Sequence, residues 1–580
     1  MPQSISDLGY ASRMKLSCTL LLFTLSSLPA FAQSWTAKLD KDIRFYQSTE
    51  MGVVIAGTEK SLYAIDGSTG DILWRRKDTS LDETDVAPVP GTDLVLLSLE
   101  KGDKARIEAV DLLTGDSIWR SDKIKGAVMQ MSVDPEMNLL AVVLAKDAKD
   151  RARDGFKRHP LLHVLDLAGG DELWKYEVGE VEMMPARWPE DSGKEVDYTL
   201  DNYYPPVFAG ERLYVFYEGV TSFDARSGKE RLREKYRVNE EGLALTEAEP
   251  IFTESSIYAS GRGRVRAISR QTGDREWEAK DLGLTPEMML VGDVLYVRTG
   301  GQFTRLKDGE TIERGPYGVS AIDIRSGKGL WRYKGADKGI TNLLLPDRNT
   351  IAIADRDDLI LLDASSGKRM IHVPHKIEHV SFGLLNERGD VVIGGQSEIA
   401  GFDAVSGRQL WRARHPPPSR GIFRTVAAIA ARAASLYFRF GTPALTAVRG
   451  VQVARVVTSL SCSRSSLSNL QALATASNGR QRSSGFKRFG IASRVRDRID
   501  PSRQLDRLSH FLWHRERLAT LRGQWMYFYT GNGLAGVDVN NGRTEREVRL
   551  SDLDERFVTD EALGLLFTAS GNRLLSHGLH

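Results

Sequence analysis

The feature that most constrains the fold is a short phrase that recurs along the chain and first reads SLYAIDGSTGDILWR, at residues 61–75. An alternating apolar stretch ends at Asp66, turn-forming residues follow as far as Gly70, and a second short stretch ends at Trp74. This pattern is typical of a tight hairpin between two half-buried strands. Five copies keep the Asp, the Gly four residues later and the Trp eight residues later: Asp66, Gly70 and Trp74; Asp111, Gly115 and Trp119; Asp166, Gly170 and Trp174; Asp323, Gly327 and Trp331; Asp403, Gly407 and Trp411. We expect the Asp to bond backbone amides of the turn, the Gly to adopt a positive φ, and the Trp to serve packing.

Weaker copies of the phrase fill the intervals: Asp224 with Gly228, Ser269 with Gly273 and Trp277, Asp363 with Gly367, and Asp538 with Gly542. From Asp66 to Asp403, successive copies stand 40 to 58 residues apart, a period typical of arrays built from one small sheet per repeat. A β-rich pair precedes each motif hairpin, so we expect four strands per unit. The repeat therefore predicts an all-β fold, a β-propeller of four-stranded blades in which the Trp packs between neighbouring blades.

The repeat resembles that of the pyrroloquinoline-quinone (PQQ) family of β-propellers, which includes quinoprotein dehydrogenases and BamB-type proteins. The shared pattern is apolar-Tyr-Ala-apolar-Asp-x-x-Thr-Gly-x-x-apolar-Trp, and it covers residues 44–414 and, more weakly, 523–580. The resemblance implies a ring of eight blades, while the copy at Asp538 and a further β pair at 564–576 allow nine or ten. Trp35 resembles the last strand of a blade, which predicts that the amino terminus closes the ring by pairing with the carboxy-terminal strands.

The sequence predicts four parts: upstream residues and a signal peptide at 1–32, propeller blades at 33–414, a basic insertion at 415–522, and closing propeller strands at 523–580. A positive charge at Lys15, an apolar run and the sequence Ala30-Phe31-Ala32 indicate a cleavable signal. We therefore expect export to the periplasm or cell envelope. Only Cys462 remains after cleavage, so we expect no intrachain disulfide.

The insertion differs in charge from the rest of the chain. Between Arg420 and Arg522, 19 Lys and Arg residues face four acids, a net charge of +15, which leaves −13 elsewhere. Its first part has apolar residues at helical spacing and places Arg424, Arg432 and Arg439 on one face. We expect a mainly helical, partly disordered segment. Three hypotheses stay open for it: contact with the protein's own acidic propeller, contact with an anionic membrane surface, or contact with a partner protein. Nucleic acid is the least favoured because of export.

Candidate metal ligands are sparse in the sequence. His510 and His514 are four residues apart on a predicted helix, but no third ligand is evident. Asp355, Asp357 and Asp358 fall in a hairpin turn, where a solvated loop is expected because the Gly and Glu of a calcium loop are missing. The sequence therefore predicts no metal site.

Two functional hypotheses follow. The first is an exported, non-enzymatic scaffold for protein–protein interaction at the bacterial cell envelope, BamB-like in type, without a cofactor. The alternative is a PQQ-dependent oxidoreductase with divergent ligands, in which PQQ and Ca²⁺ would be bound as the resemblance implies. The chain has no adjacent Cys pair of the kind found in many quinoproteins, and no segment allows catalytic or cofactor-binding residues to be assigned by position.

Overall fold

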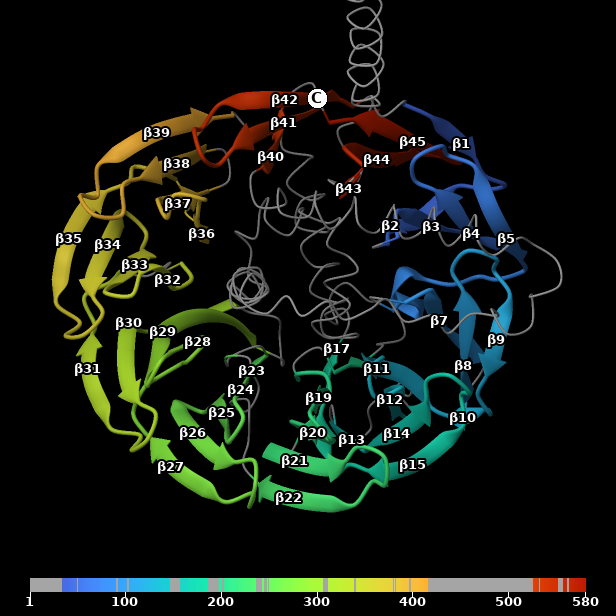
Figure 1. The fold of residues 1–580 in the computed structure, drawn as a ribbon, viewed down its shortest axis with the longest axis horizontal. Helices are drawn as coiled ribbons and strands as arrows, with labels where there is room; N and C mark the ends of the chain where they lie inside the picture. The colour runs from blue at the N-terminus through green and yellow to red at the C-terminus, as the bar shows by residue number, and fades with distance from the viewer. Residues whose placement is uncertain are drawn as a thin grey trace, which may run out of the picture.

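The computed structural model describes residues 34–415 and 525–579, apart from short gaps of which the longest are 147–156 and 186–197. In these ranges the chain forms ten antiparallel sheets that follow one another around a ring (Figure 1). The predicted β-propeller is confirmed, with ten blades rather than eight. The weaker motif copies and the carboxy-terminal strand pair all form blades of their own.

The first five blades along the chain consist of β2 (Ile43–Ser48), β3 (Val53–Thr58), β4 (Ser61–Asp66) and β5 (Ile72–Lys77); β6 (Val86–Pro88), β7 (Leu94–Lys101), β8 (Lys104–Asp111) and β9 (Ser117–Arg120), with β10 (Ile124–Lys125); β11 (Ala127–Asp134), β12 (Leu139–Ala145), β14 (Pro160–Asp166) and β15 (Glu172–Glu177); β19 (Val207–Ala209), β20 (Arg212–Val215), β21 (Gly219–Asp224) and β22 (Glu230–Lys235); and β24 (Ile251–Phe252), β25 (Ser256–Gly261), β26 (Arg264–Ser269) and β27 (Arg275–Ala279).

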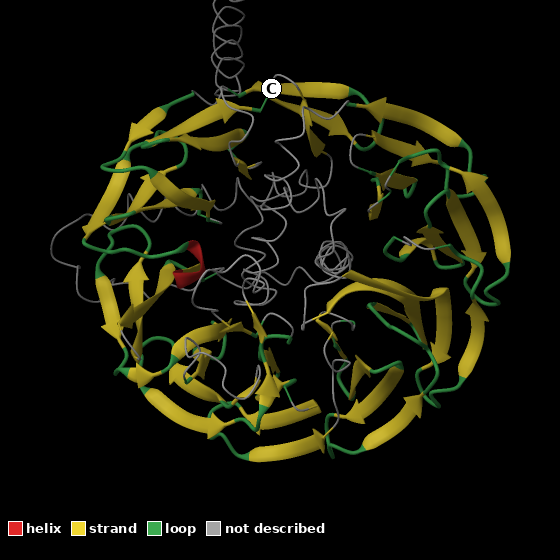
Figure 2. Cartoon of the chain, turned by 180° about the vertical axis from the view of Figure 1, so that it is seen from behind, coloured by secondary structure: helices red, strands yellow, loops and turns green. Residues whose placement is uncertain are grey.

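The other five blades consist of β28 (Glu287–Val291), β29 (Val294–Arg305), β30 (Thr311–Asp323) and β31 (Gly329–Tyr333); β32 (Leu344–Asp347), β33 (Thr350–Ala354), β34 (Asp358–Asp363) and β35 (Arg369–Pro374); β36 (Phe382–Leu385), β37 (Val391–Gly394), β38 (Glu398–Phe402) and β39 (Gln409–Arg414); β40 (Trp525–Thr530), β41 (Gly533–Asp538) and β42 (Thr544–Arg549); and β43 (Phe557–Asp560), β44 (Leu565–Ser570) and β45 (Arg573–Gly578), with β1 (Thr36–Lys38). A 3₁₀ turn at Glu83–Asp85 is the one helical element of the described ranges (Figure 2).

The ring is closed by strands from both ends of the described chain. Strand β1 pairs antiparallel with β45, with Thr36 opposite Leu575 and Ala37 opposite Leu574. The closing sheet therefore has the order β1-β45-β44-β43, in which the amino-terminal strand is the outermost. This is the closure that Trp35 predicts, and it leaves the ring without an open end between its first and last blades.

Burial follows the position of a strand within its blade. The middle strand β3 is buried along its whole length, whereas the outer strand β5 alternates and buries Trp74. Middle strands have neighbouring blades on both faces, so their sequences are continuous apolar runs rather than alternating ones. The hydrophobic core accordingly lies between blades, and one cluster joins Val54 and Ile65 of an early blade to Phe567 and Leu574 of the closing blade.

Two stretches between motif copies extend beyond the blades. Strands β29 and β30 continue past the blade as a long hairpin, and β23 (Leu243–Ala244) pairs with the distal part of β29. The other stretch contributes the short ribbons β13 (Lys157–Arg158) with β16 (Val181–Glu182), and β17 (Met184–Pro185) with β18 (Tyr198–Thr199).

The predicted signal peptide at 1–32 and the insertion at 415–522, including Arg424, Arg432 and Arg439, lie outside the described residues except for His415. The expectations for these segments remain predictions. Within the part of the chain that the structure describes, no helix is long and apolar enough to cross a membrane.

Candidate functional site

The Asp and Gly of the repeated motif form the turn between the third and fourth strands of a blade. In the first copy, Asp66 Oδ1 accepts the backbone N–H groups of Ser68 at 2.8 Å and Thr69 at 3.2 Å. The N–H of Gly70 donates to the Asp66 carbonyl at 2.8 Å, and Gly70 has a φ of 82°. All the motif glycines share this positive φ, which explains the choice of glycine at this position. The motif Asp residues are therefore engaged by their own turns.

The Trp of one blade packs on the motif Gly of the next. A Cβ atom placed on Gly170 would lie 2.3 Å from Trp119 Cε3, so the ring occupies the space left by the missing side chain. The indole Nε1 of Trp119 also donates to the carbonyl of Leu167, at 2.7 Å. The same bond joins Trp35 to Gly67, Trp74 to Leu112, Trp174 to Ala225, Trp277 to Ile324, and Trp331 to Ala364. Each of these six outer seams thus combines close packing with one directional bond.

Two of the other outer seams differ from these six in ways that the structure describes. Ile371 replaces the Trp in one blade and packs against Gly407 without any polar contribution. Trp411 lies against Gly542 of the next blade and Gly401 of its own. Its buried Nε1 has no hydrogen-bond partner within the described ranges.

On the inner side of the ring, neighbouring blades are joined by buried side-chain amides rather than by Trp indoles. The side chain of Asn342 donates to the carbonyl of Gly383 at 3.0 Å and accepts the N–H of Gly383 at 2.9 Å, which links two neighbouring blades. Gln130 donates to the carbonyl of Tyr203 at 3.0 Å and accepts the hydroxyl of Tyr217. Because Gln130 is fully buried, these bonds fix the stretch before β19 to the inner strand β11.

Buried charges are paired within their own region of the ring. Glu287 on β28 and Arg298 on β29 form an ion pair of 2.9 Å, and both side chains are almost completely buried. Glu287 also accepts the backbone N–H of Leu343, at 3.1 Å. Glu278 pairs with arginines of its own and the adjacent strand, and Glu398 pairs with two arginines of the adjacent strand. Removing one partner of the Glu287–Arg298 pair would leave an uncompensated buried charge, so the loss of either side chain alone is expected to destabilise the blade.

The acidic turn at 355–358 buries one of its three acids, Asp355, while Asp357 is exposed. Asp355 is buried, and its Oδ1 accepts the backbone N–H groups of Asp357 at 3.1 Å and Asp358 at 2.9 Å. Its Oδ2 accepts the N–H of Asp337 at 2.9 Å. The expectation of a solvated loop is therefore wrong for Asp355, because backbone amides satisfy its carboxylate. Among the described residues, no group of three or more His, Cys, Asp or Glu side chains could hold a metal ion. His510 and His514 lie outside them.

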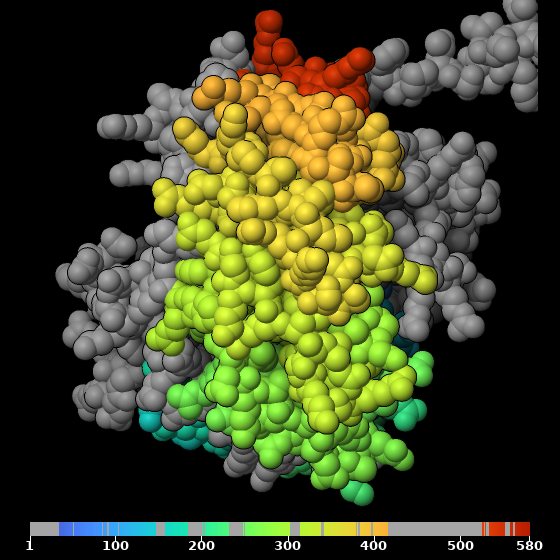
Figure 3. Space-filling view, turned by 90° about the vertical axis from the view of Figure 1, so that its left-hand side faces the viewer, coloured from blue at the N-terminus to red at the C-terminus, as the bar shows by residue number. Residues whose placement is uncertain are grey.

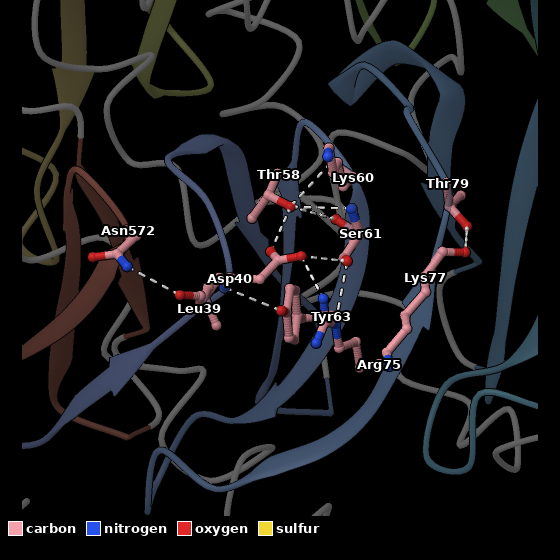
Figure 4. Close-up of polar contacts among 10 residues, drawn as sticks. All are labelled: Leu39, Asp40, Thr58, Lys60, Ser61, Tyr63, Arg75, Lys77, Thr79 and Asn572. Carbon is pink, nitrogen blue, oxygen red and sulfur yellow. Dashed lines mark hydrogen bonds and ion pairs between the residues drawn. The ribbon is translucent and has the colours of Figure 1, made fainter.

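A polar cluster joins the closing strand to the first complete blade (Figure 4). Asp40 follows β1, and its carboxylate accepts the hydroxyls of Thr58 at 2.9 Å and Ser61 at 2.8 Å. Arg75 of β5 forms an ion pair with the same carboxylate. Burial raises the pKa of Asp40, but the bonds from Ser61, Thr58 and Tyr63 and the charge of Arg75 outweigh burial and lower it to about 2. No sequence pattern indicates this cluster, since its members are far apart in the chain and only the fold brings them together.

The outer strands of three successive blades, β31, β35 and β39, carry exposed apolar side chains. Leu330 is 52 % exposed, Met370 49 % and Leu410 37 %. All three occupy the position three residues after the motif Gly, immediately before the Trp position. A cation stands immediately after the motif Gly in the same copies. We call these six residues the basic–apolar wall: Lys328, Leu330, Lys368, Met370, Arg408 and Leu410. The side of the ring that carries the wall faces the viewer in Figure 3, where the three blades run from yellow-green to orange.

The wall has a signal in the repeat, but the signal is visible only when the copies are compared at the positions between the motif Gly and the Trp. The motif residues that the sequence did single out are distributed around the whole ring and converge on no common centre (Figure 1). The sequence does not identify a catalytic or cofactor-binding residue by its position, and we assign no such role to any of the described residues.

Ten blades, closed by an amino-terminal strand and joined by repeated Trp–Gly seams, define a β-propeller of the PQQ-like class. A family model described as outer membrane protein assembly factor BamB matches residues 31–184, 186–312 and 317–476. These ranges span most of the chain, so the protein belongs to this family.

No curated protein matches the sequence. Among solved structures, BamB from Moraxella catarrhalis is 14 % identical, with a TM-score of 0.33 over 65 % of this chain and 97 % of that one. Quinohemoprotein alcohol dehydrogenase from Comamonas testosteroni is 13 % identical, with a TM-score of 0.30 over 70 % of this chain and 81 % of that one. A computationally designed protein, Ika8, is 15 % identical, with a TM-score of 0.33 over 62 % of this chain and 94 % of that one. These similarities do not distinguish a scaffold from an enzyme.

Proposed function

We propose that the protein is an exported, non-enzymatic scaffold that binds partner proteins at the bacterial cell envelope. The observation that carries the proposal is how the ring uses its polar side chains. The motif Asp residues hold turns, Asn342 and Gln130 join blades, and Glu287 neutralises Arg298 inside a blade. The hydrogen bonds and ion pairs of these groups serve the fold. Catalysis would instead need an acid, base or nucleophile that is free to contact a substrate.

Membership of the family described as outer membrane protein assembly factor BamB supports the envelope as the place of action. The predicted signal peptide agrees with that place. A large ring with rigid seams offers extended surfaces at both rims and along its circumference, which suits simultaneous contact with several partners. PQQ and Ca²⁺ are accordingly expected to be absent from the working protein.

The experiment that tests the proposal is a titration of the purified full chain with PQQ in the presence of Ca²⁺, followed by the absorbance of the cofactor. We expect no saturable binding and no reduction of an artificial electron acceptor with alcohol or sugar substrates. A quinoprotein dehydrogenase loaded in parallel serves as the control for active PQQ and Ca²⁺.

A second arm of the experiment tests the scaffold itself. The tagged protein, cross-linked in the intact envelope and purified under denaturing conditions, is expected to retain specific envelope proteins. Saturable PQQ binding with dye reduction, and no cross-linked partner, would replace the scaffold by the oxidoreductase.

A further inference from the structure

The basic–apolar wall differs from the other blades in the charge beside the exposed hydrophobe, since Leu73 and Leu173 are exposed at the same position in copies that have an Asp after the motif Gly. The residue after the motif Gly is an acid in four other copies: Asp71, Asp116, Asp171 and Asp274. In the three successive copies of the wall it is Lys328, Lys368 or Arg408. The other copies with a cation there, Lys229 and Arg543, have charged residues two positions later instead of a hydrophobe. The combination of a cation and an exposed hydrophobe is thus confined to one arc of the ring.

The charge of Arg408 acts on the carboxylate of Asp403 in its own turn, but the three cations of the wall are otherwise exposed. Lys328, Lys368 and Arg408 are exposed, and none forms an ion pair with another residue of the described ranges. The outer strand β27 shows the opposite arrangement, since Arg275 there pairs with Glu278 at 3.0 Å. Exposed cations that form no ion pair, beside exposed hydrophobes, indicate an interaction surface rather than ordinary solvated surface.

Further exposed cations lie on the same three outer strands or next to them, namely Lys334, Arg369 and Lys376, while Arg414 is exposed but pairs with Glu398 at 2.9 Å. The stretches from the motif Gly to the end of each of these strands contain no acid. The nearest motif acids, Asp323, Asp363 and Asp403, accept hydrogen bonds from their own turns. On these strands and their turns the cations outnumber the three motif acids, so the arc keeps an excess of positive charge.

The three outer strands face broadly one side of the molecule, because three successive blades of ten occupy less than a third of the ring (Figures 1 and 3). Their apolar side chains stand singly, one per blade, and each is accompanied by a cation on the same strand. A partner protein would be expected to bury a compact cluster of large side chains in pockets. Single hydrophobes among long cationic side chains match the interface of an anionic bilayer instead.

We infer that the basic–apolar wall docks the ring onto an anionic phospholipid surface. Lys328, Lys368 and Arg408 would bind headgroup phosphates, while Leu330, Met370 and Leu410 enter the boundary between headgroups and acyl chains. This inference goes beyond the proposed scaffold function and holds whether or not the ring binds PQQ, because it concerns the outside of the ring.

The test uses the full chain and co-sedimentation with two kinds of vesicle, phosphatidylcholine alone and phosphatidylcholine with phosphatidylglycerol. The wall variant carries Lys328→Asp, Lys368→Asp and Arg408→Asp, and sister blades show that Asp is compatible with this position. The control variant carries Lys77→Asp, Lys125→Asp and Lys229→Asp, exposed positions outside the arc, and changes the net charge by a closely matched amount.

We expect the natural protein to bind the anionic vesicles and not the neutral ones, with affinity that falls as salt is added. The wall variant should bind about tenfold more weakly or worse, since each surface cation contributes severalfold to binding, while the control variant keeps most of the affinity. A third variant, Leu330→Ser, Met370→Ser and Leu410→Ser, keeps all charges and should also bind severalfold more weakly.

Three results would overturn the inference. Equal loss in the wall and control variants would mean that only net charge matters. Unchanged binding of the wall variant would assign the contact to another part of the chain, such as the basic segment 420–522. Failure of the natural protein to bind either vesicle would exclude the lipid contact. If an acidic protein were then retained by the wall, the surface would be a protein interface.

Discussion

At the scale of single residues, the motif Gly is constrained both by its backbone and by its neighbour. Gly170 has a φ of 78° and lies under the ring of Trp119. Gly292 also has a positive φ, of 57°, but no atom lies within 4 Å of the place of its missing Cβ. The two positions therefore separate the cost of the backbone conformation from the cost of the seam.

We predict that Gly170→Ala destabilises the protein by about 1–3 kcal/mol more than Gly292→Ala. Both variants carry the penalty of about 1 kcal/mol for Ala in the left-handed region, and only the first also displaces Trp119. Thermal unfolding of the two variants beside the natural protein measures the difference. Equal midpoints would show that the indole adapts and that the seam does not require Gly.

Asp40 predicts a dependence of stability on acid pH. Its pKa is about 2 in the folded protein against an ordinary value of 3.8, because hydroxyl bonds and Arg75 outweigh the effect of burial. A folded pKa below the unfolded one adds stability that is complete above about pH 4 and is lost as pH falls through about 2. We expect Asp40→Asn to lower the free energy of unfolding by up to about 2 kcal/mol at pH 7, with the difference shrinking between pH 4 and pH 2. Parallel stability curves over that interval would contradict the role of the carboxylate.

At the scale of strands, the sequence best predicts the elements that adjoin the motif turn, because their residues are close together in the chain. The third and fourth strands of a blade are joined by the motif turn, so Asp66 and Trp74 locate β4 and β5 directly. The inner strands carry no such signal, because some are very short, as with β24 (Ile251–Phe252), and their partners are set by the ring. The preference for eight blades came from the resemblance, whereas the number ten follows from counting the weaker copies and the pair β44–β45 as blades.

At the scale of the whole molecule, the sequence predicted the class of fold and little of the surface. Two contacts join segments that only folding brings together: the hydrogen bond of Asn342 to Gly383 and the ion pair of Asp40 with Arg75. No short sequence pattern predicts either contact. The wall is different, since Lys328 and Leu330 stand in the repeat itself. The sequence alone does not identify the wall as one surface, because it does not show that β31, β35 and β39 belong to neighbouring blades on the outside of a ring.

Closure is the property of the whole ring that depends on the fewest residues. Strand β1 is three residues long, yet it completes the last blade, and Trp35 beside it packs on Gly70 and donates to Gly67 at 3.0 Å. The N–H of Leu39 donates to Asn572 and the carbonyl of Trp35 accepts the N–H of Ser576. Because hydrogen-bonded pairs alternate along an antiparallel ladder, Ala37 also points its N–H toward β45, and Thr36 points its own away.

We therefore predict that Ala37→Pro lowers the midpoint of thermal unfolding by several degrees and that the matched variant Thr36→Pro has little effect. Proline removes a ladder bond at the first position and only a solvent-facing N–H at the second. Loss of that bond loosens the seam between the first and last blades, so global unfolding and limited proteolysis near residue 34 should both become easier in Ala37→Pro alone. If the two variants unfold alike, ring stability would rest on the cluster around Val54, Phe567 and Leu574 rather than on the pairing of β1 with β45.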